Sequence, residues 1–278
     1  MATGTAGLVR QVGNGSRLRL RELKLRLVSG LILATIGLSA LALGGLAFDC
    51  LCALGAGLMM WELSRLFWPE VPRGLAVTIG VLALAAVLTA ASLGADLVAA
   101  WLVLIFAAVA AAAAMRRDKV LMAVFGGVIL LSALVLAELR AQQGMVAAAW
   151  LVLLVVATDT AAYVCGKVVG GPRLAPSLSP GKRWSGAVGG AVAAVLITTA
   201  FAGSFSLVIV IFGLTLSVAS QFGDLAESWI KRRAGVKDSS ALIPGHGGVL
   251  DRFDGLVGAC GFFGVLEMFR VAARVGIG

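Results

Sequence analysis

The residues best suited to chemistry lie between Asp224 and Asp254, where charged side chains gather beside long apolar runs. This stretch contains five acidic residues, five basic residues and the only histidine of the chain. An ionised group at bilayer depth costs about 2.5–3.5 kcal/mol, so a mostly apolar chain needs a reason to carry so many. Both signs of charge together indicate a site for anions, metal ions or both.

The first part of this stretch is expected to be a helix that continues to Arg233. One broad face of that helix carries four candidate residues: Asp224, Ser228, Lys231 and Arg232. An anion or a hydrated metal ion beside this face would meet charges of both signs. For Glu227 and Lys231, four residues apart, the alternative is a salt bridge that stabilises the point where the helix leaves the membrane.

A glycine-rich loop follows, with Lys237 near its start and His246, Gly247 and Gly248 near its end. Glycines allow backbone amides to approach a phosphate closely. His246 lacks the second histidine or the cysteines of a zinc site, so we expect it to hydrogen-bond a phosphate or an aspartate. Its use as a general acid or base stays open. In phosphoryl transfer, a phosphate nucleophile that is already ionised has little need of a base.

Two aspartates end the stretch. Asp251 and Asp254 share one side if the next helix begins there, and Arg252 lies between them. Carboxylate oxygens beside phosphate-binding cations are what Mg²⁺ requires, so we predict that Asp251 binds metal and that Asp254 is a further candidate. The alternative is a helix N-terminus stabilised by acidic residues, an effect of about 0.3–1 kcal/mol.

A second polar segment begins with Asp159 inside an apolar run. An intramembrane acid is expected to face the bundle interior or a polar cavity, with Lys167, Lys182 or a metal ion as its partner. Lys182 precedes Arg183 and Trp184, so this part could also be an interfacial anchor with snorkelling cations.

The composition predicts an all-α, polytopic integral membrane protein. Hydrophobic residues make up 60% of the chain and charged residues 13%. Nine apolar runs are long enough to span, or nearly span, about 30 Å of hydrocarbon. These runs lie near residues 27–47, 48–67, 74–94, 97–115, 119–138, 145–165, 186–202, 204–222 and 256–274. Only Gly44, Gly45 and Asp49 suggest the break between the first two.

The distribution of lysine and arginine predicts a cytoplasmic N-terminus. In that orientation the outside loops contain only Arg140, although Arg270 and Arg274 at the C-terminus would also lie outside. We divide the chain into a basic segment 1–26, N-terminal helices 27–140 and a catalytic region 141–278. Two long polar loops, 166–185 and 223–255, then share the cytoplasmic face, as a composite active site requires.

Other classes of site are disfavoured. The net charge is +9, but basic residues crowd the N-terminus and short loops, which indicates topology and lipid attraction rather than nucleic-acid binding. The four cysteines lack zinc-ligand spacing and are expected to be buried and reduced. The first apolar run is longer than the core of a signal peptide, so we expect it to remain in the membrane.

The segment from Ser228 to Asp254 resembles the signature of the phosphatidate cytidylyltransferase family. It matches the pattern Ser-x-hydrophobic-Lys-Arg, four residues, Lys-Asp, then Pro-x-His-Gly-Gly-hydrophobic-x-Asp-Arg-Phe-Asp. Further similarity lies upstream, at Asp159, Tyr163, Gly166, Lys167, Ser179 and Pro180. The family usually has Lys-Lys-Thr-Trp-Glu-Gly where this chain has Gly181-Lys182-Arg183-Trp184-Ser185-Gly186, so a lysine, a threonine and a glutamate of the family pattern are replaced.

The resemblance implies an integral membrane enzyme that joins CTP to phosphatidic acid, giving CDP-diacylglycerol and pyrophosphate, with one or two Mg²⁺ ions. It implies that Asp224 and Asp251 hold metal with support from Asp254. Phosphate-binding roles are implied for Lys231, Arg232, Lys237 and Arg252. Substrate contacts are implied for Asp159, Tyr163, Lys167, Ser179, Lys182, Ser228, His246, Gly247 and Gly248. A homodimer in the bacterial inner membrane, with its active site facing the cytoplasm, is also expected.

Two other functions remain to be weighed. A polyprenol or dolichol kinase would transfer the γ-phosphoryl group of CTP, but the complete signature argues against it. A secondary transporter would use Asp159 and Asp224 to couple ions, but the inverted repeats or broken helices typical of that class are not visible. The motif spacing of CDP-alcohol phosphotransferases is absent from the sequence.

Overall fold

The computed structural model describes residues 4–94 and 96–275, and side chains within 23–94 and 96–270. Within these residues the chain forms nine helices and a two-stranded hairpin. The elements are α1 (Gly4–Leu43), α2 (Gly45–Phe67), α3 (Arg73–Ser92), α4 (Leu97–Ala114), α5 (Lys119–Gln143), α6 (Met145–Val168), β1 (Arg173–Ala175), β2 (Ser179–Arg183), α7 (Trp184–Ala202), α8 (Leu207–Arg233) and α9 (Leu250–Val275). Eight of the described helices, α1 to α8, are long and apolar enough to cross a membrane, which confirms the predicted fold class.

The first helix starts earlier than the apolar runs predicted. α1 begins at Gly4 rather than near residue 27, because leucine, arginine, lysine and glutamate in the basic segment all favour helix. The predicted basic segment 1–26 otherwise lies largely outside the described side chains.

The structure contains the predicted break between the first two apolar runs. α1 ends at Leu43 and α2 begins at Gly45. Gly44 and Gly45 both have positive φ angles, 65° and 49°, a conformation that other residues rarely adopt. Arg140 of α5 then donates to the carbonyl oxygens of Leu41 and Ala42 at 2.7 and 3.2 Å, which satisfies the end of α1.

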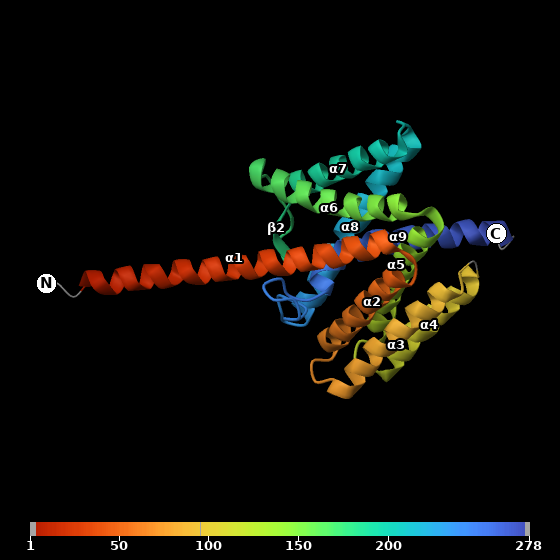
Figure 1. Cartoon of the computed structure of the whole chain (residues 1–278), viewed down its shortest axis with the longest axis horizontal. Helices are drawn as coiled ribbons and strands as arrows, with labels where there is room; N and C mark the ends of the chain where they lie inside the picture. The colour runs from red at the N-terminus through yellow and green to blue at the C-terminus, as the bar shows by residue number, and fades with distance from the viewer. Residues whose placement is uncertain (1–3, 95, 276–278) are drawn as a thin grey trace.

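Figure 1 shows two groups of helices with α9 between them. One group contains α2 to α5 and surrounds the larger apolar core, in which Met60, Leu63 and Leu130 are fully buried. The other contains α6 to α8. α9 packs against α5 of the first group and α8 of the second, so it joins the two groups.

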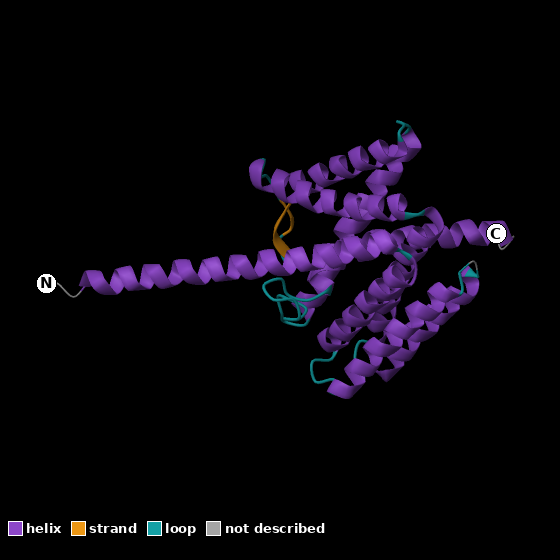
Figure 2. Cartoon of the chain, viewed as in Figure 1, coloured by secondary structure: helices purple, strands orange, loops and turns teal. Residues whose placement is uncertain are grey.

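The hairpin and the longest loop lie at the same end of the bundle (Figure 2). The predicted loop 166–185 is shorter than expected, since α6 continues to Val168 and Arg173 pairs with Arg183 across the hairpin. The predicted loop 223–255 is reduced to residues 234–249, because α8 continues to Arg233 as predicted and α9 begins at Leu250.

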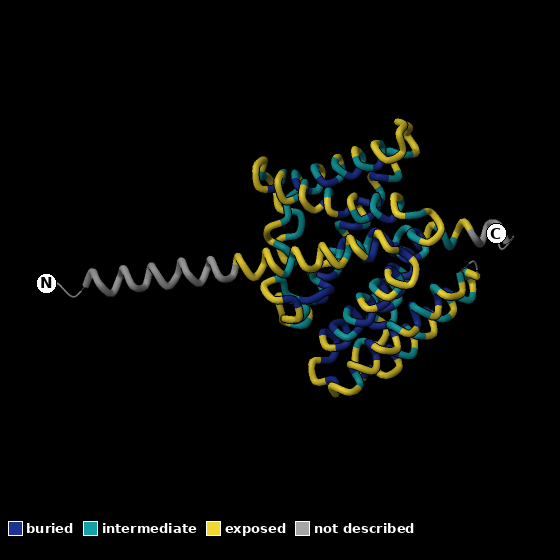
Figure 3. Tube along the Cα trace, in the orientation of Figure 1, coloured by how far each residue is buried: buried dark blue, intermediate teal, exposed yellow. Residues whose placement is uncertain are grey.

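The outer surface of the helices is apolar. Figure 3 shows that the described part of α1 is exposed along most of its length. Its exposed side chains include Leu27, Leu31 and Leu38, each more than 60% exposed. Large exposed aliphatic residues on a helix of this length are typical of a surface that faces lipid.

Candidate active site

A polar cavity of about 720 Å³ opens between α6, α7, α8, the start of α9 and the hairpin. Its volume lies in the range typical of small-molecule sites, about 300–1,000 Å³. Ten residues predicted from the sequence line it: Asp159, Tyr163, Lys167, Ser179, Lys182, Asp224, Lys231, Asp251, Arg252 and Asp254. These ten residues come from α6, α8, α9 and the hairpin and lie up to 95 positions apart in the sequence, yet they meet in one cavity.

Three carboxylates form a compact cluster on α8 and α9, and two of them, Asp224 and Asp254, line this cavity. Asp224, Glu227 and Asp254 each offer an oxygen, and these atoms all lie within 4.8 Å of one another. Burial raises the pKa of Asp254 above its usual range, and the carboxylates of Asp224 and Asp159 raise it further. Crowded carboxylates of this kind repel one another unless a cation lies between them, and hard oxygen ligands suit Mg²⁺.

Glycines bring the cluster together. A Cβ atom at Gly223 of α8 would lie 2.8 Å from the Cα atom of Gly258 on α9, and closer still to the backbone oxygen of Asp254. A Cβ atom at Gly258 would lie 2.9 Å from the Cα atom of Gly223. Only residues without side chains let these two helices cross so closely, and Asp224 and Asp254 sit at the crossing.

Two lysines balance the carboxylates. Lys182 of β2 places its Nζ 2.5 Å from an oxygen of Asp224. Lys231 of α8 bridges Glu227 at 2.6 Å and Asp251 at 2.8 Å. The salt bridge weighed for Glu227 and Lys231 is therefore present, but it lies within the site.

Asp251 has a different environment from the other acids. Its carboxylate accepts hydrogen bonds from Lys231, from the backbone amide of Ser239 at 2.9 Å and from that of Gly248 at 2.7 Å. Burial alone would raise its pKa, but hydrogen bonds from Glu227, Lys231 and the Gly248 amide outweigh that effect, and the pKa of Asp251 falls to about 2. Asp251 therefore holds Lys231 and the loop, while Asp254 and Glu227 lie next to Asp224. That Asp251 binds metal stays a prediction.

Gly247 and Gly248 of the loop also lie where there is no room for a side chain. A Cβ atom at Gly247, whose φ angle is 84°, would lie 2.6 Å from an oxygen of Asp251. A Cβ atom at Gly248 would collide with Ser239 and Glu62. The Gly248 amide, predicted to face a phosphate, donates to Asp251.

Several predicted residues lie outside the lining of the cavity. They are Ser228, Arg232, Lys237, His246, Gly247 and Gly248. Arg232 donates to the carbonyl oxygens of Leu178 and Val236 at 3.3 and 3.2 Å, so it joins α8 to the hairpin. The His246 ring, predicted to bond a phosphate or an aspartate, has its Nδ1 2.8 Å from the hydroxyl oxygen of Ser29 on α1.

Two further cations and one aromatic residue line the cavity: Lys167 and Tyr163 on α6, and Arg252 on α9. Lys167 lies over the ring of Tyr163, with its Nζ 5.6 Å from the ring centroid. Arg252 lines the cavity and donates to the carbonyl oxygen of His246 at 3.0 Å. Such donors can approach phosphate oxygens from the loop side.

Two acidic residues of this region are not predicted as site residues. For Glu227 the sequence favours a salt bridge to Lys231, and it predicts no role for Glu62. Glu62 of α2 is completely buried and accepts hydrogen bonds from the loop before α9. A signal was present, because a carboxylate within the apolar run 48–67 is costly unless it has a partner.

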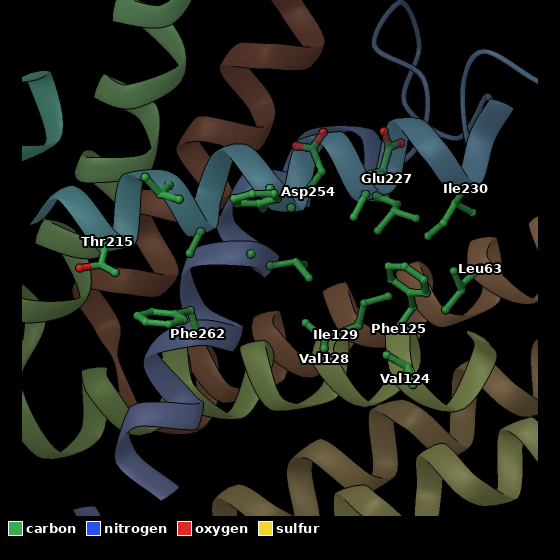
Figure 4. Close-up of a pocket in the computed structure, with 18 residues that line it drawn as sticks. Leu63, Val124, Phe125, Val128, Ile129, Thr215, Glu227, Ile230, Asp254 and Phe262 are labelled. Carbon is green, nitrogen blue, oxygen red and sulfur yellow. The ribbon is translucent and has the colours of Figure 1, made fainter. Parts of the chain in front are cut away.

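A second, apolar groove of about 490 Å³ lies on the other side of the α8–α9 pair. Figure 4 shows its wall of apolar side chains, including Val128, Ile129 and Phe262, with the carboxylates of Glu227 and Asp254 pointing away from them. Glu227 and Asp254 therefore border the groove, but their carboxylates point away from its apolar wall.

Comparison with known proteins gives one family. Residues 24–269 match the family described as "Cytidylyltransferase family". A phosphatidate cytidylyltransferase of Brucella suis biovar 1 (strain 1330) is 52% identical over 134 residues, which cover 46% of this chain and 50% of that protein. The Haemophilus influenzae (strain ATCC 51907 / DSM 11121 / KW20 / Rd) protein of the same name is 47% identical over 126 residues, covering 42% and 44%. That of Helicobacter pylori (strain ATCC 700392 / 26695) is 38% identical over 134 residues, covering 46% and 50%. The chain thus spans about half the length of the curated relatives it matches.

Proposed function

Because the chain belongs to the cytidylyltransferase family, we propose that it is a phosphatidate cytidylyltransferase that makes CDP-diacylglycerol for phospholipid synthesis. The observation that carries the proposal is the polar cavity lined by Asp224, Asp254, Lys182 and Lys231, with the buried Glu227 completing an acidic cluster beside it. Carboxylates that can hold a metal ion, next to cations that can bind phosphates, form the donor set required to join two anionic substrates.

In the proposed reaction, an oxygen of the phosphate group of phosphatidic acid attacks the α-phosphorus of CTP. A new P–O bond forms, the bond between the α-phosphorus and the bridging oxygen to the β-phosphorus breaks, and pyrophosphate leaves with the electron pair. The attacking phosphate is already ionised, so no general base is needed. The main task of the site is to bring two anions together and to stabilise the charge that develops.

The donor set of the cluster fits Mg²⁺. Asp224, Glu227 and Asp254 would hold the ion, which when bound neutralises phosphate charge. Three carboxylate groups can serve one ion or share two.

The lysines are proposed to act on the phosphates. Lys182 is 2.5 Å from Asp224 and only partly exposed, so it would meet a phosphate beside the cluster. Lys231 is held between Glu227 and Asp251, which fixes its ammonium group at the cavity wall. Lys167 and Arg252 would contact the phosphates that lie nearer the loop.

The lipid substrate is proposed to reach the cavity from the bilayer, with its acyl chains remaining among the helices. We place the cavity and the N-terminus on the cytoplasmic side of a bacterial inner membrane, since the ends of helices on the cavity side carry most of the described basic residues. A homodimer is the expected assembly by family resemblance.

A transfer assay tests the proposal. Purified protein in detergent receives phosphatidic acid, Mg²⁺ and CTP labelled at either the α- or the γ-phosphate. We expect α-label in the lipid product and γ-label in pyrophosphate, with no product when phosphatidic acid or metal is omitted. Transfer of γ-label to a polyprenol would replace the proposal with a kinase, and absence of transfer by folded protein to either lipid would reject it.

A further inference from the structure

A buried carboxylate, remote in sequence from the residues that line the polar cavity, binds the loop that leads into this cavity. Glu62 lies on α2, and its side chain is completely buried. Its Oε1 accepts a hydrogen bond from the Ser240 hydroxyl at 2.6 Å and from the Val249 amide at 2.9 Å. Its Oε2 accepts from the Ser239 hydroxyl at 3.0 Å and from the Leu250 amide at 2.7 Å.

These four donors are uncharged, and two of them are backbone amides where α9 begins. The first amides of a helix have no partner within the helix and favour a negative charge. Glu62 supplies that charge from another helix. Burying a carboxylate is costly unless its oxygens are fully hydrogen-bonded, and here each oxygen accepts two bonds.

A continuous series of contacts joins Glu62 to the acidic cluster. Ser239 donates its hydroxyl to Glu62 and its backbone amide to Asp251. Asp251 is bound to Lys231, and Lys231 to Glu227. Every link is a hydrogen bond or ion pair of 3.0 Å or less, and most of the atoms are shielded from solvent.

We propose that Glu62 is a positioning residue for the proposed transfer reaction, which fixes the loop 239–250 so that Asp251 and Lys231 face the acidic cluster. The inference rests on the proposed function, but the anchoring itself can be measured without activity. It gives the helices before residue 140 a direct part in the site, whereas the sequence assigned the chemistry to residues 141–278.

Replacement of Glu62 by glutamine tests this role, because the side chain keeps its size while one oxygen becomes an amide donor. A serine hydroxyl can rotate to accept from that donor, but a backbone N–H cannot, so one amide at the start of α9 loses its partner. Glu70→Gln is the matched control, since Glu70 is an exposed acid in the turn after α2. Both variants are made in the full chain and purified in the same detergent.

Two readouts separate anchoring from catalysis. Hydrogen exchange of peptides covering 239–250 is expected to accelerate about tenfold in Glu62→Gln, while peptides of α3 are unchanged. The kcat for transfer from CTP is expected to fall about tenfold, with KM for CTP changed less than about threefold, because mispositioning acts mainly in the transition state. Glu70→Gln should match the wild-type protein in both.

Each other result overturns part or all of the inference. Unchanged exchange in 239–250 would show that Glu62 does not anchor the loop. Faster exchange with unchanged kcat would make the anchor structural only. If wild-type protein does not transfer CMP, the proposed function fails while the exchange result still decides the anchoring.

Ser240→Ala covers the case in which Glu62→Gln does not fold. This change removes one hydroxyl donor to Glu62 and leaves the carboxylate and both amides in place. We expect a fall in kcat of about threefold together with faster exchange of 239–250. Wild-type values for both in folded Ser240→Ala protein would contradict the inference.

Discussion

The polar cavity and the apolar groove lie on opposite sides of the same two helices. Asp254 borders both, yet its carboxylate points away from the apolar wall of the groove (Figure 4). The cavity gathers lysines and carboxylates, whereas the groove is lined by residues such as Val128 and Phe222. The difference shows that side-chain direction, and not depth in the bundle alone, decides where chemistry is possible.

The close crossing of α8 and α9 separates the two regions. At Gly223 and Gly258 the backbones leave no room for a side chain, so the wall between the cavity and the groove is backbone. A change at the crossing should therefore disturb the cavity strongly, while a change on the apolar side should not.

The largest effect is expected at the acidic cluster. Asp224→Asn removes one negative charge from the three carboxylates and the partner of Lys182. We expect kcat to fall about a thousandfold with the thermal midpoint little changed, measured by lipid-dependent pyrophosphate release. Activity within tenfold of wild type would contradict a role for Asp224 in the transfer.

The helix crossing should rank next. Gly223→Ala places a Cβ atom against the backbone of Asp254 and Gly258, so α9 must shift and carry Asp254 with it. Displacement of a reacting group by about 1 Å can cost about a hundredfold in kcat, and we expect a loss of that size. Gly37→Ala on α1 is the control, because a Cβ atom there meets nothing within 4 Å, and it should retain wild-type activity.

The low pKa of Asp251 predicts how stability depends on pH. Its folded pKa of about 2 lies below the unfolded value of 3.8, so it contributes stability above about pH 4 that is lost as the pH falls toward 2. The difference corresponds to about 2 kcal/mol. Acid unfolding in detergent should show this loss for wild-type protein and a flatter pH dependence for Asp251→Asn. Identical curves for the two proteins would argue against the hydrogen-bonded environment of Asp251.

Lys182 should have a smaller effect, centred on binding. Lys182→Gln keeps a polar group near Asp224 but loses the positive charge that meets substrate phosphate. We expect KM for CTP to rise about tenfold, measured by initial rates over a range of CTP concentrations. An unchanged KM with lower kcat would instead indicate that Lys182 acts in the transition state.

The smallest effect is expected in the groove. Phe222→Ala shortens an exposed side chain that lines it, without touching the carboxylates. Transfer activity should change less than about twofold, because lipid can fill the space that the ring leaves. A tenfold loss would show that the two sides of the α8–α9 pair are not separate in function.

The sequence predicted the helices well, because an apolar run of about 20 residues has few alternatives in a membrane. It also placed the continuation of α8 to Arg233 and the start of the next helix beside Asp251. The hairpin of residues 173–183 was not predicted, since its strands are short and polar and carry little periodicity.

The arrangement of the acids could not be obtained from spacing. Asp251 and Asp254 are equivalent as residues on one side of a helix, but the rotation of α9 against α8 decides that Asp254 meets Asp224. Glu62 and Leu250 lie 188 positions apart, and only the packing of α2 against the loop brings them together. Long-range pairings of this kind depend on tertiary structure rather than on local pattern.

The most direct test of the acidic cluster is the position of a bound metal ion. Crystals of the protein grown with CTP and Mn²⁺ in place of Mg²⁺ would show the ion by its anomalous scattering. We expect a peak enclosed by the carboxylates of Asp224, Glu227 and Asp254, and the loss of this peak in crystals of Asp254→Asn. A peak on Asp251 with the three-carboxylate cluster empty would contradict this expectation.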